Sequence, residues 1–172
     1  VIWLSGEQSA GDGTFTAATQ PKVTAYLNGG GKLFVSGSEI GWDLVARGGG
    51  ASFFASTLRG SYPADSGGTT WNNSDDAGTY NAVGAGGSIF AGISLSFSNG
   101  SGEMYDVDYP DKVFPAAGSG ATTAMNYSGG TGGSAGIQYA SGNTRLVYLG
   151  FPFEAITTAA NRNAVMAAVL NF

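Results

Sequence analysis

The sequence contains neither cysteine nor histidine. Without cysteine the chain can form no disulfide bond, no thiolate nucleophile and no cysteine metal site. Without histidine it lacks the side chain that most often moves protons near neutral pH. Acyl transfer by a cysteine, or by a serine paired with histidine, is therefore excluded for this chain on its own.

Charged residues are also scarce, at 11% of the chain, against roughly 25% in an average soluble domain. The formal net charge is −5, and the seven lysines and arginines are scattered, so no basic stripe is available for a nucleic-acid backbone. No apolar run approaches the ~20 residues of a membrane span. We therefore predict neither nucleic acid nor a membrane span among the partners of this protein.

The remaining composition is that of a packed globule with a neutral polar surface. Hydrophobic residues make up 42% of the 172 residues, and glycine is abundant, with 30 residues. The length predicts one domain over residues 1–172. Few charges and much Gly, Ser, Thr and Asn favour an extracellular, secreted bacterial protein. The chain opens directly in the apolar stretch VIWL rather than in a signal peptide, which predicts a fragment of a longer protein.

Both ends of the sequence have the alternating texture of an α/β protein. VIWLSG (1–6) and KLFVSG (32–37) are typical of buried strands, and the segment between them predicts a helix over 16–28. Residues 145–153 predict a third buried strand, followed by a helix over 158–171. We expect the three strands to lie parallel and near one another, in a three-layer α/β fold with a mostly parallel sheet and flanking helices. Glycine-rich connectors and short strand candidates over about 60–141 predict a β-rich insertion or sheet extension.

Four blocks in this order carry a resemblance to a known family: GEQS (6–9), YLNGGGKLFVSGSEIGWDL (26–44), DVDYPD (106–111) and YLGFPFEAI (148–156). The chain resembles a class I glutamine-amidotransferase-like, flavodoxin-like module of large secreted bacterial proteins. The resemblance implies the fold, the extracellular context and other domains of a parent chain as partners. It also implies that a first strand is missing here, and it carries no activity over.

The stretch from Gly37 to Gly41 matches the Gly-x-nucleophile-x-Gly pattern of a nucleophile elbow. The pattern places Glu39 at the apex and Ser38 one position away from it. Turning over an ester on a carboxylate needs a base that activates water, and no histidine is available. A serine–lysine pair has no motif that links a lysine to Ser38. We favour a degenerate elbow in which Glu39 binds a ligand or accepts hydrogen bonds from backbone, serine or tryptophan neighbours.

Glu7 and Glu39 each lie just past the C-terminal end of a predicted parallel strand, at the edge where open α/β sheets bind ligands. Trp42 and Asp43 follow at the same edge, and Glu154 follows the last strand. These residues and Ser38 are the candidate binding residues. Alternatively each carboxylate accepts hydrogen bonds from loop N–H groups and holds loops in place, which we favour for Glu154.

A second acidic segment contains Asp106, Asp108 and Asp111. Oxygens at alternate positions suit Ca²⁺, although the glycine and closing glutamate of an EF-hand loop are missing. A solvated strand edge that leads into a Tyr-Pro turn is the alternative. No other cofactor is predicted. Trp71 could stack on a sugar ring or lie buried under its own loop.

Three functions remain open from the sequence. The favoured one is a non-catalytic accessory module of a secreted protein, which binds a glycan or a protein or packs against neighbouring domains. The second is a glycan hydrolase that uses Glu7, Glu39 and Asp43, because paired carboxylates cleave glycosides without histidine. The third is a self-assembling subunit of an extracellular structure.

Overall fold

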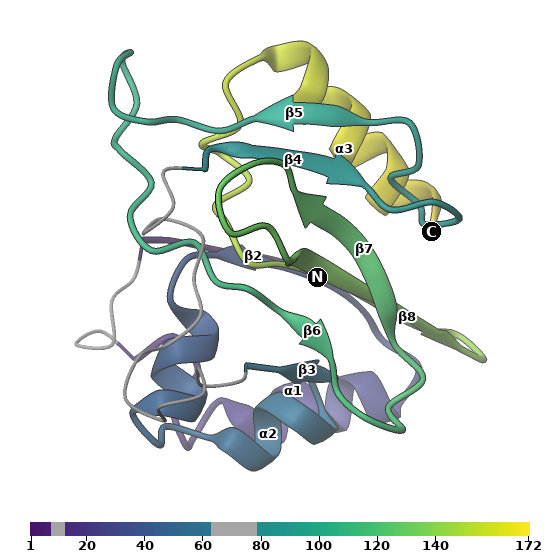
Figure 1. Cartoon of the computed structure of the whole chain (residues 1–172). Coiled ribbons are helices and arrows are strands. Elements are labelled where there is room, and N and C mark those ends of the chain that lie inside the picture. The colour runs from purple at the N-terminus through teal and green to yellow at the C-terminus, as the bar shows by residue number, and fades with distance from the viewer. Residues whose placement is uncertain (8–12, 63–78) are drawn as a thin grey trace.

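The computed structural model describes residues 1–7, 13–62 and 79–172. Its elements follow one another along the chain as β1 (Ile2–Gly6), α1 (Gln20–Asn28), β2 (Lys32–Gly37), the π-helical turn η1 (Trp42–Ala46), α2 (Ala51–Ser56), β3 (Gly60–Ser61), β4 (Asn81–Gly84), β5 (Ser94–Ser96), β6 (Phe114–Pro115), β7 (Thr122–Tyr127), β8 (Ser134–Ser141), β9 (Thr144–Leu149) and α3 (Ala159–Asn171). Figure 1 shows these elements along the chain.

Seven of the strands form one sheet in the order β1-β2-β9-β8-β7-β4-β5, and β3 pairs with β6 in a small separate ribbon. β1, β2 and β9 are neighbours and run parallel. The prediction of three adjacent parallel strands is therefore confirmed. All further pairings in this sheet, from β9 through β8, β7 and β4 to β5, are antiparallel.

The predicted three-layer fold with a mostly parallel sheet is wrong. The sheet is mixed and curls into a half-barrel with few helices (Figure 1). Of the two alternatives for residues 60–141, the insertion is wrong and the sheet extension is confirmed, because β4, β5, β7 and β8 are members of the main sheet. The parallel part ends at β9, and the antiparallel part forms the rest of the curl.

Short connections explain this change of direction. β8 and β9 are joined by the two residues Gly142 and Asn143, with Ser141 paired to Thr144 across the turn. A two-residue loop permits only an antiparallel hairpin, whereas a parallel crossover needs about a dozen residues. Gly142 has a φ of 52°, as such a tight turn requires. The glycine-rich link between β7 and β8 is likewise too short for a parallel crossover.

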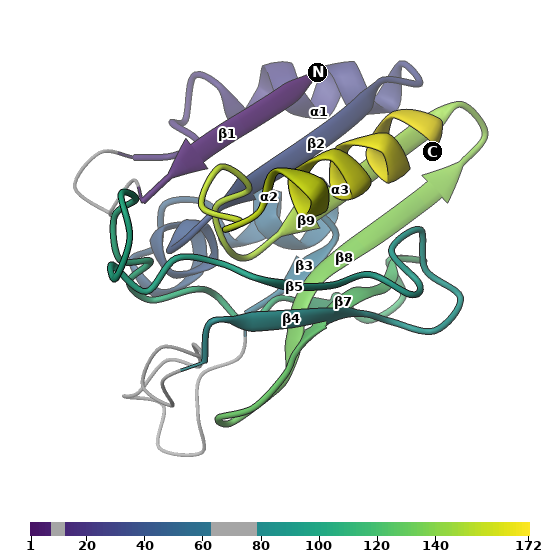
Figure 2. The same cartoon turned by 90° about the horizontal axis from the view of Figure 1, so that it is seen from above.

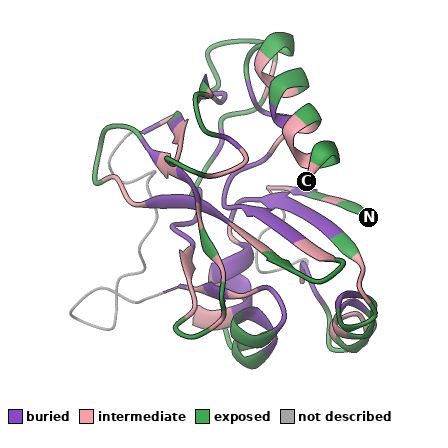
Figure 3. Cartoon of the chain, turned by 90° about the vertical axis from the view of Figure 1, so that its right-hand side faces the viewer, coloured by how far each residue is buried: buried purple, intermediate pink, exposed green. Residues whose placement is uncertain are grey.

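Helices cover both faces of the parallel strands (Figure 2). α1 and α2 pack on one face, where Val23 of α1 and Phe53 of α2 belong to the same buried cluster. α3 packs on the other face through Val165, while its outer turns are exposed (Figure 3). The predicted helix over 158–171 agrees with α3, which Thr158 caps, whereas the predicted helix over 16–28 begins four residues too early, because α1 starts at Gln20 beside Pro21.

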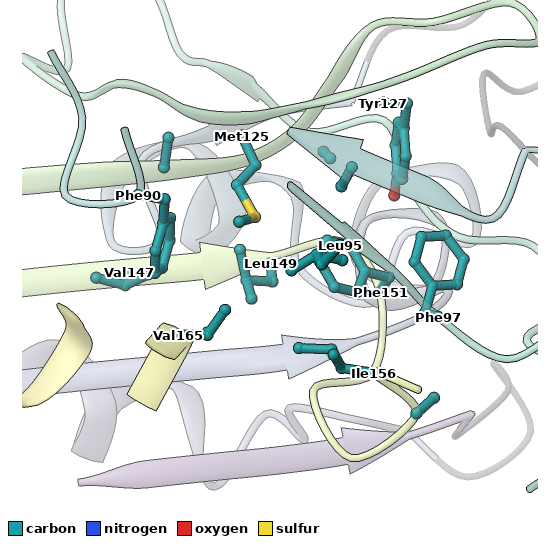
Figure 4. Close-up of a cluster of buried hydrophobic side chains, with 14 of the residues drawn as sticks. Phe90, Leu95, Phe97, Met125, Tyr127, Val147, Leu149, Phe151, Ile156 and Val165 are labelled. Atoms are coloured by element: carbon teal, nitrogen blue, oxygen red, sulfur yellow. The ribbon is translucent and has the colours of Figure 1, made fainter. Parts of the chain in front are cut away.

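The two faces of β2 feed two separate cores. Leu33 and Val35 point to the α1 side, and Phe34 points to the α3 side, as the period of two in a strand requires. The α3-side core, drawn in Figure 4, continues under the antiparallel strands and includes the residues labelled there: Phe90, Leu95, Phe97, Met125, Tyr127, Val147, Leu149, Phe151, Ile156 and Val165.

β1 is less buried than the sequence predicts. It is an edge strand, and Ile2 and Leu4 are 50% and 45% exposed. Trp3 faces the opposite side, where its ring stacks on Phe15 at a centroid distance of 4.9 Å. β1 is therefore covered only on the face that carries Trp3, although the run VIWL is apolar throughout.

Candidate functional site

The parallel strands bring several carboxyl groups to one edge of the sheet. Glu7 directly follows β1, Glu39 follows β2 and Glu154 follows β9. The segment between β5 and β6 lies at the same edge, and two of its hydrogen bonds reach these carboxyl groups. The backbone N–H of Asp108 donates to Glu7 Oε1 at 2.6 Å, and the hydroxyl of Tyr105 donates to Glu154 Oε1 at 2.8 Å.

We call Glu7, Glu39, Asp106, Asp108 and Glu154 the carboxyl rim. Asp106 and Asp108 belong to it because their charges, with that of Glu39, act on Glu7. The sequence placed Glu7, Glu39 and Glu154 at this edge. It did not place Asp106 and Asp108 beside them, because their approach depends on a long connection between β5 and β6.

Glu39 occupies the apex of a strand–turn–helix element that has the backbone geometry of an elbow. Its φ is 58°, a left-handed conformation that non-glycine residues rarely adopt. β2 ends at Gly37, two residues before Glu39, and the helical turn η1 begins at Trp42, three residues after it. The turn is closed by the Ser38 N–H, which donates to Gly6 O at 3.0 Å, and by the Asp43 N–H, which donates to Glu39 O at 2.8 Å.

Both glycines of the elbow are needed for space. A Cβ on Gly37 would lie 2.9 Å from Ser5 Cβ, and one on Gly41 would lie 2.7 Å from the ring of Tyr62. The elbow pattern in the sequence thus reflects close packing of the turn against β1 and against the chain after α2.

The carboxyl group of Glu39 is partly exposed and accepts no hydrogen bond from any described residue. We predicted that backbone, serine or tryptophan neighbours donate hydrogen bonds to Glu39. No donor of this kind is found among residues 1–7, 13–62 and 79–172, so the prediction is wrong for this part of the chain. Burial raises the pKa of Glu39 above its ordinary value, and the charges of Asp108 and Asp43 raise it further.

Glu7 has a similar environment. Burial is the main cause that raises the pKa of its carboxyl group, and the charges of Asp108, Asp106 and Glu39 add to it. The N–H bond from Asp108 acts in the opposite direction and lowers the pKa. Glu7 and Glu39 therefore bind protons more readily than free glutamates do.

The other candidate residues, Asp43, Ser38 and Trp42, differ in burial and in their contacts. Asp43 is buried and accepts the Thr14 N–H at 3.1 Å, so it ties a loop to η1. Ser38 is fully buried, and its hydroxyl has no hydrogen-bond partner among the described residues. Trp42 is partly exposed, with the guanidinium of Arg47 5.6 Å from its ring centroid.

Glu154 acts as a holding group, although its donor is a tyrosine hydroxyl rather than the predicted loop N–H groups. It accepts the hydroxyl of Tyr105, whereas the N-terminus of α3 is capped by Thr158, whose side chain accepts the Asn161 N–H at 3.2 Å. Its second oxygen, Oε2, is buried without a partner in the described part of the chain.

The calcium prediction finds no support. Asp106 and Asp108 are exposed, whereas Asp111 is fully buried. Over residues 1–7, 13–62 and 79–172, no three acidic, histidine or cysteine side chains are grouped so that they could hold a metal ion. Trp71 lies outside the described residues.

Asp111 is the residue whose position the sequence least anticipated. Its Oδ2 accepts the Gly41 N–H at 2.6 Å and lies 3.4 Å from the hydroxyl of Tyr148 on β9. Burial raises the pKa of Asp111 to about 8, and the nearby charge of Glu39 also raises it, while the Gly41 N–H lowers it. The side chain expected to face solvent or calcium instead lies beneath the elbow.

Comparison of the chain with protein-family models, curated proteins and solved structures finds no match. In the described part of the chain, no helix is long and apolar enough to cross a membrane.

Proposed function

We propose that this chain is a non-catalytic binding module of a secreted protein, and that its carboxyl rim binds an amine or guanidinium group of a partner protein. The secreted context and the neighbouring domains of a parent chain rest on composition and on the resemblance to amidotransferase-like modules. The elbow supports that resemblance, whereas the mainly antiparallel sheet departs from it. The observation that carries the proposal is the position of Glu39, which is partly exposed at the apex of the elbow in a left-handed conformation.

Glu39 combines two unfavourable features. Its left-handed backbone costs an L-residue about 1–2 kcal/mol that glycine would avoid, and its carboxylate is partly buried without a hydrogen-bond donor from the described residues. Strained residues of this kind concentrate at binding and catalytic sites, where the surrounding structure maintains them. A ligand that supplies a hydrogen-bond donor would relieve the second feature.

The charge around Glu39 favours a cation over a neutral sugar. Among the described residues, no lysine or arginine shifts the pKa of Glu7 or Glu39, and the charged groups that raise these pKa values are all carboxylates. A bound amine or guanidinium would replace this repulsion by attraction and form charge-assisted hydrogen bonds.

Aromatic side chains stand beside the rim. Tyr105 and Tyr109 are 38% and 47% exposed, and Trp42 is partly exposed next to the elbow. Tyr109 follows Asp108 directly and also has a positive φ, of 49°. Aromatic faces attract cations, so these rings suit the same class of ligand as the carboxylates.

The proposal is tested with a hexalysine peptide, titrated into the protein by calorimetry at low ionic strength and near neutral pH. Glu39→Gln should weaken binding by about fivefold, the loss expected for one partly exposed charge pair. Glu103→Gln is the matched control, because Glu103 is exposed, lies outside the rim and changes the net charge equally. Equal losses in both variants would show nonspecific attraction to an acidic protein and would refute the proposal.

The pH dependence of peptide binding provides an independent check. Because the pKa values of Glu7 and Glu39 are raised, the rim loses its charge at a higher pH than ordinary glutamates do. Affinity should therefore fall as pH decreases through these raised values. Affinity that stays constant until ordinary glutamates protonate would argue against the rim.

A glycan hydrolase is the second candidate. It is favoured by the raised pKa values of two neighbouring carboxyl groups, since a glycosidase needs one carboxyl group that stays protonated as its general acid. A screen of β-linked oligosaccharides, with Glu39→Gln as the control, decides between the two. Turnover that is lost in Glu39→Gln would replace the binding module by an enzyme.

A further inference from the structure

Asp111 joins the elbow to the centre of the sheet. Its side chain is fully buried and accepts the Gly41 N–H, as described above. Its backbone is held as well, since the Asp111 N–H donates to Gly150 O at 2.7 Å and the Tyr127 hydroxyl donates to Asp111 O at 2.9 Å. The residue is therefore attached to the end of β9, to β7 and to the elbow at once.

Two glycines lie in close contact with Asp111. A Cβ on Gly150 would lie 2.2 Å from Asp111 O, and one on Gly41 would lie 3.2 Å from Asp111 Oδ2. Glycine at position 41 lets the backbone of the elbow approach the Asp111 carboxyl group, and glycine at position 150 lets the chain after β9 approach the Asp111 backbone carbonyl. Asp111 is thus a rigid support for Gly41.

The environment of the carboxyl group is suited to accepting hydrogen bonds rather than to carrying a charge. Its pKa is raised to about 8, mainly by burial, so the group is mostly neutral near pH 7. Two titratable groups of the described residues act on the Asp111 carboxyl group, namely Glu39 on the elbow and the phenol of Tyr148. The phenols of Tyr127 and Tyr62 act in turn on Tyr148. Over the described residues, Oδ1 has no hydrogen-bond partner.

Glu39 lies between two anchored points. On its N-terminal side, the Ser38 N–H is bonded to Gly6 O in β1, and on its C-terminal side the Gly41 N–H is bonded to Asp111. We propose that Asp111 is the positioning residue of the carboxyl rim, because its bond to Gly41 holds Glu39 in the left-handed conformation that presents its carboxyl group. This inference rests on the proposed function in so far as the Glu39 carboxyl group is presented to a ligand. The left-handed conformation of Glu39 does not depend on that function.

The conformation is tested without any ligand by the ¹³Cα and ¹³Cβ chemical shifts of Glu39, which report its backbone angles. Asp111→Ala removes the acceptor and should move both shifts of Glu39 toward extended or random-coil values. Asp111→Asn retains an oxygen acceptor for Gly41 and should preserve them. Thr79→Ala is the control for a generic loss, because Thr79 is a buried polar residue outside the elbow and its hydroxyl has no described partner. Native Glu39 shifts in a folded Asp111→Ala protein would overturn the inference.

Binding of hexalysine separates this inference from the proposed function. Asp111→Ala should weaken peptide binding by about fivefold, like the loss of the Glu39 charge itself, whereas Asp111→Asn and Thr79→Ala should change it by less than about twofold. Because Asp111→Asn also removes the ionisable group, loss of a charge would not explain the difference between Asp111→Ala and Asp111→Asn. If the unaltered protein binds no peptide while the Glu39 shifts respond as expected, the proposed function fails and the positioning role of Asp111 stands. If Asp111→Asn moves the Glu39 shifts as far as Asp111→Ala does, or if Asp111→Ala binds the peptide like the unaltered protein, the positioning role is refuted.

Discussion

Replacement of Glu39 by glycine tests directly whether the elbow stores strain. At a φ of 58°, an L-residue pays about 1–2 kcal/mol relative to glycine. Glycine has the greater freedom in the unfolded chain, which offsets about 0.5–1 kcal/mol of that gain. Glu39→Gly should therefore raise the free energy of unfolding by about 0.5–1 kcal/mol, although it removes a side chain.

Two matched variants separate strain from charge at the same position. Glu39→Ala keeps the Cβ and the strained backbone and removes the carboxyl group. The free energy of unfolding of Glu39→Gly should therefore exceed that of Glu39→Ala by the same net gain of about 0.5–1 kcal/mol. Glu39→Gln keeps the shape and removes the charge. Because no described residue donates a hydrogen bond to the Glu39 carboxyl group, we expect no loss of stability from Glu39→Gln.

The charge contribution also has a defined pH dependence. The pKa of Glu39 is raised in the folded state, so the folded protein holds the proton more strongly than the unfolded chain does. The free energy of unfolding therefore decreases as pH rises from the ordinary glutamate value through the raised folded value. Glu39→Gln should be more stable than the unaltered protein above this window, and the difference should disappear below it.

The assay is urea denaturation monitored by circular dichroism, with the slope of each transition compared among variants. An increase of about 1 kcal/mol corresponds to roughly 2–4 °C in the melting temperature of a protein of this size. A Glu39→Gly protein that is less stable than Glu39→Ala would refute the interpretation that the elbow is strained.

Three further variants test the packing of the fold by the same denaturation assay. Gly84→Ala should destabilise the protein by about 3 kcal/mol or more, because its Cβ would lie 1.7 Å from Phe90 O. Gly86→Ala is the control and should change stability by less than about 1 kcal/mol, because nothing lies within 4 Å of its Cβ. Similar losses in both variants would contradict the clash. Thr158→Ala should cost about 1 kcal/mol through the lost cap of α3, and an unchanged urea midpoint would show that the cap contributes nothing. Phe97→Ala should cost about 3–5 kcal/mol, since Phe97 is only 2% exposed and stacked within the core of Figure 4; a loss below about 1 kcal/mol would mean that the core there is not closely packed.

Local patterns in the sequence were sufficient for several parts of this structure. The runs VIWL, KLFVSG and RLVYL predicted β1, β2 and β9, because unbroken apolar runs are typical of parallel strands under helices. Gly37 and Gly41 predicted the elbow and placed Glu39 at its apex, because this turn requires glycine on both sides for close packing. Each of these features depends on residues near one another in the chain.

The antiparallel direction of β8 relative to β9 is also encoded locally. Gly142 and Asn143 form a two-residue turn of the type that closes hairpins. The prediction of an insertion or sheet extension over about 60–141 does not use this turn, and so it leaves out the antiparallel pairing of β8 with β9. The order in which β8, β7, β4 and β5 then join the sheet is set by long-range register, which short apolar runs do not specify.

Only the tertiary structure decided which carboxyl groups are buried and which are presented. Asp111 and Asp108 belong to one acidic segment and look alike in the sequence, but Asp111 is buried against Gly41, which lies 70 residues earlier, and Asp108 remains exposed. Glu39 could have accepted hydrogen bonds from its neighbours, and whether any residue of the described part of the chain donates to it depends on where β1 and the loop before β6 pack. A carboxyl group in a low-dielectric interior is governed by the donors and charges around it, and these come from parts of the chain that meet only when the sheet has formed.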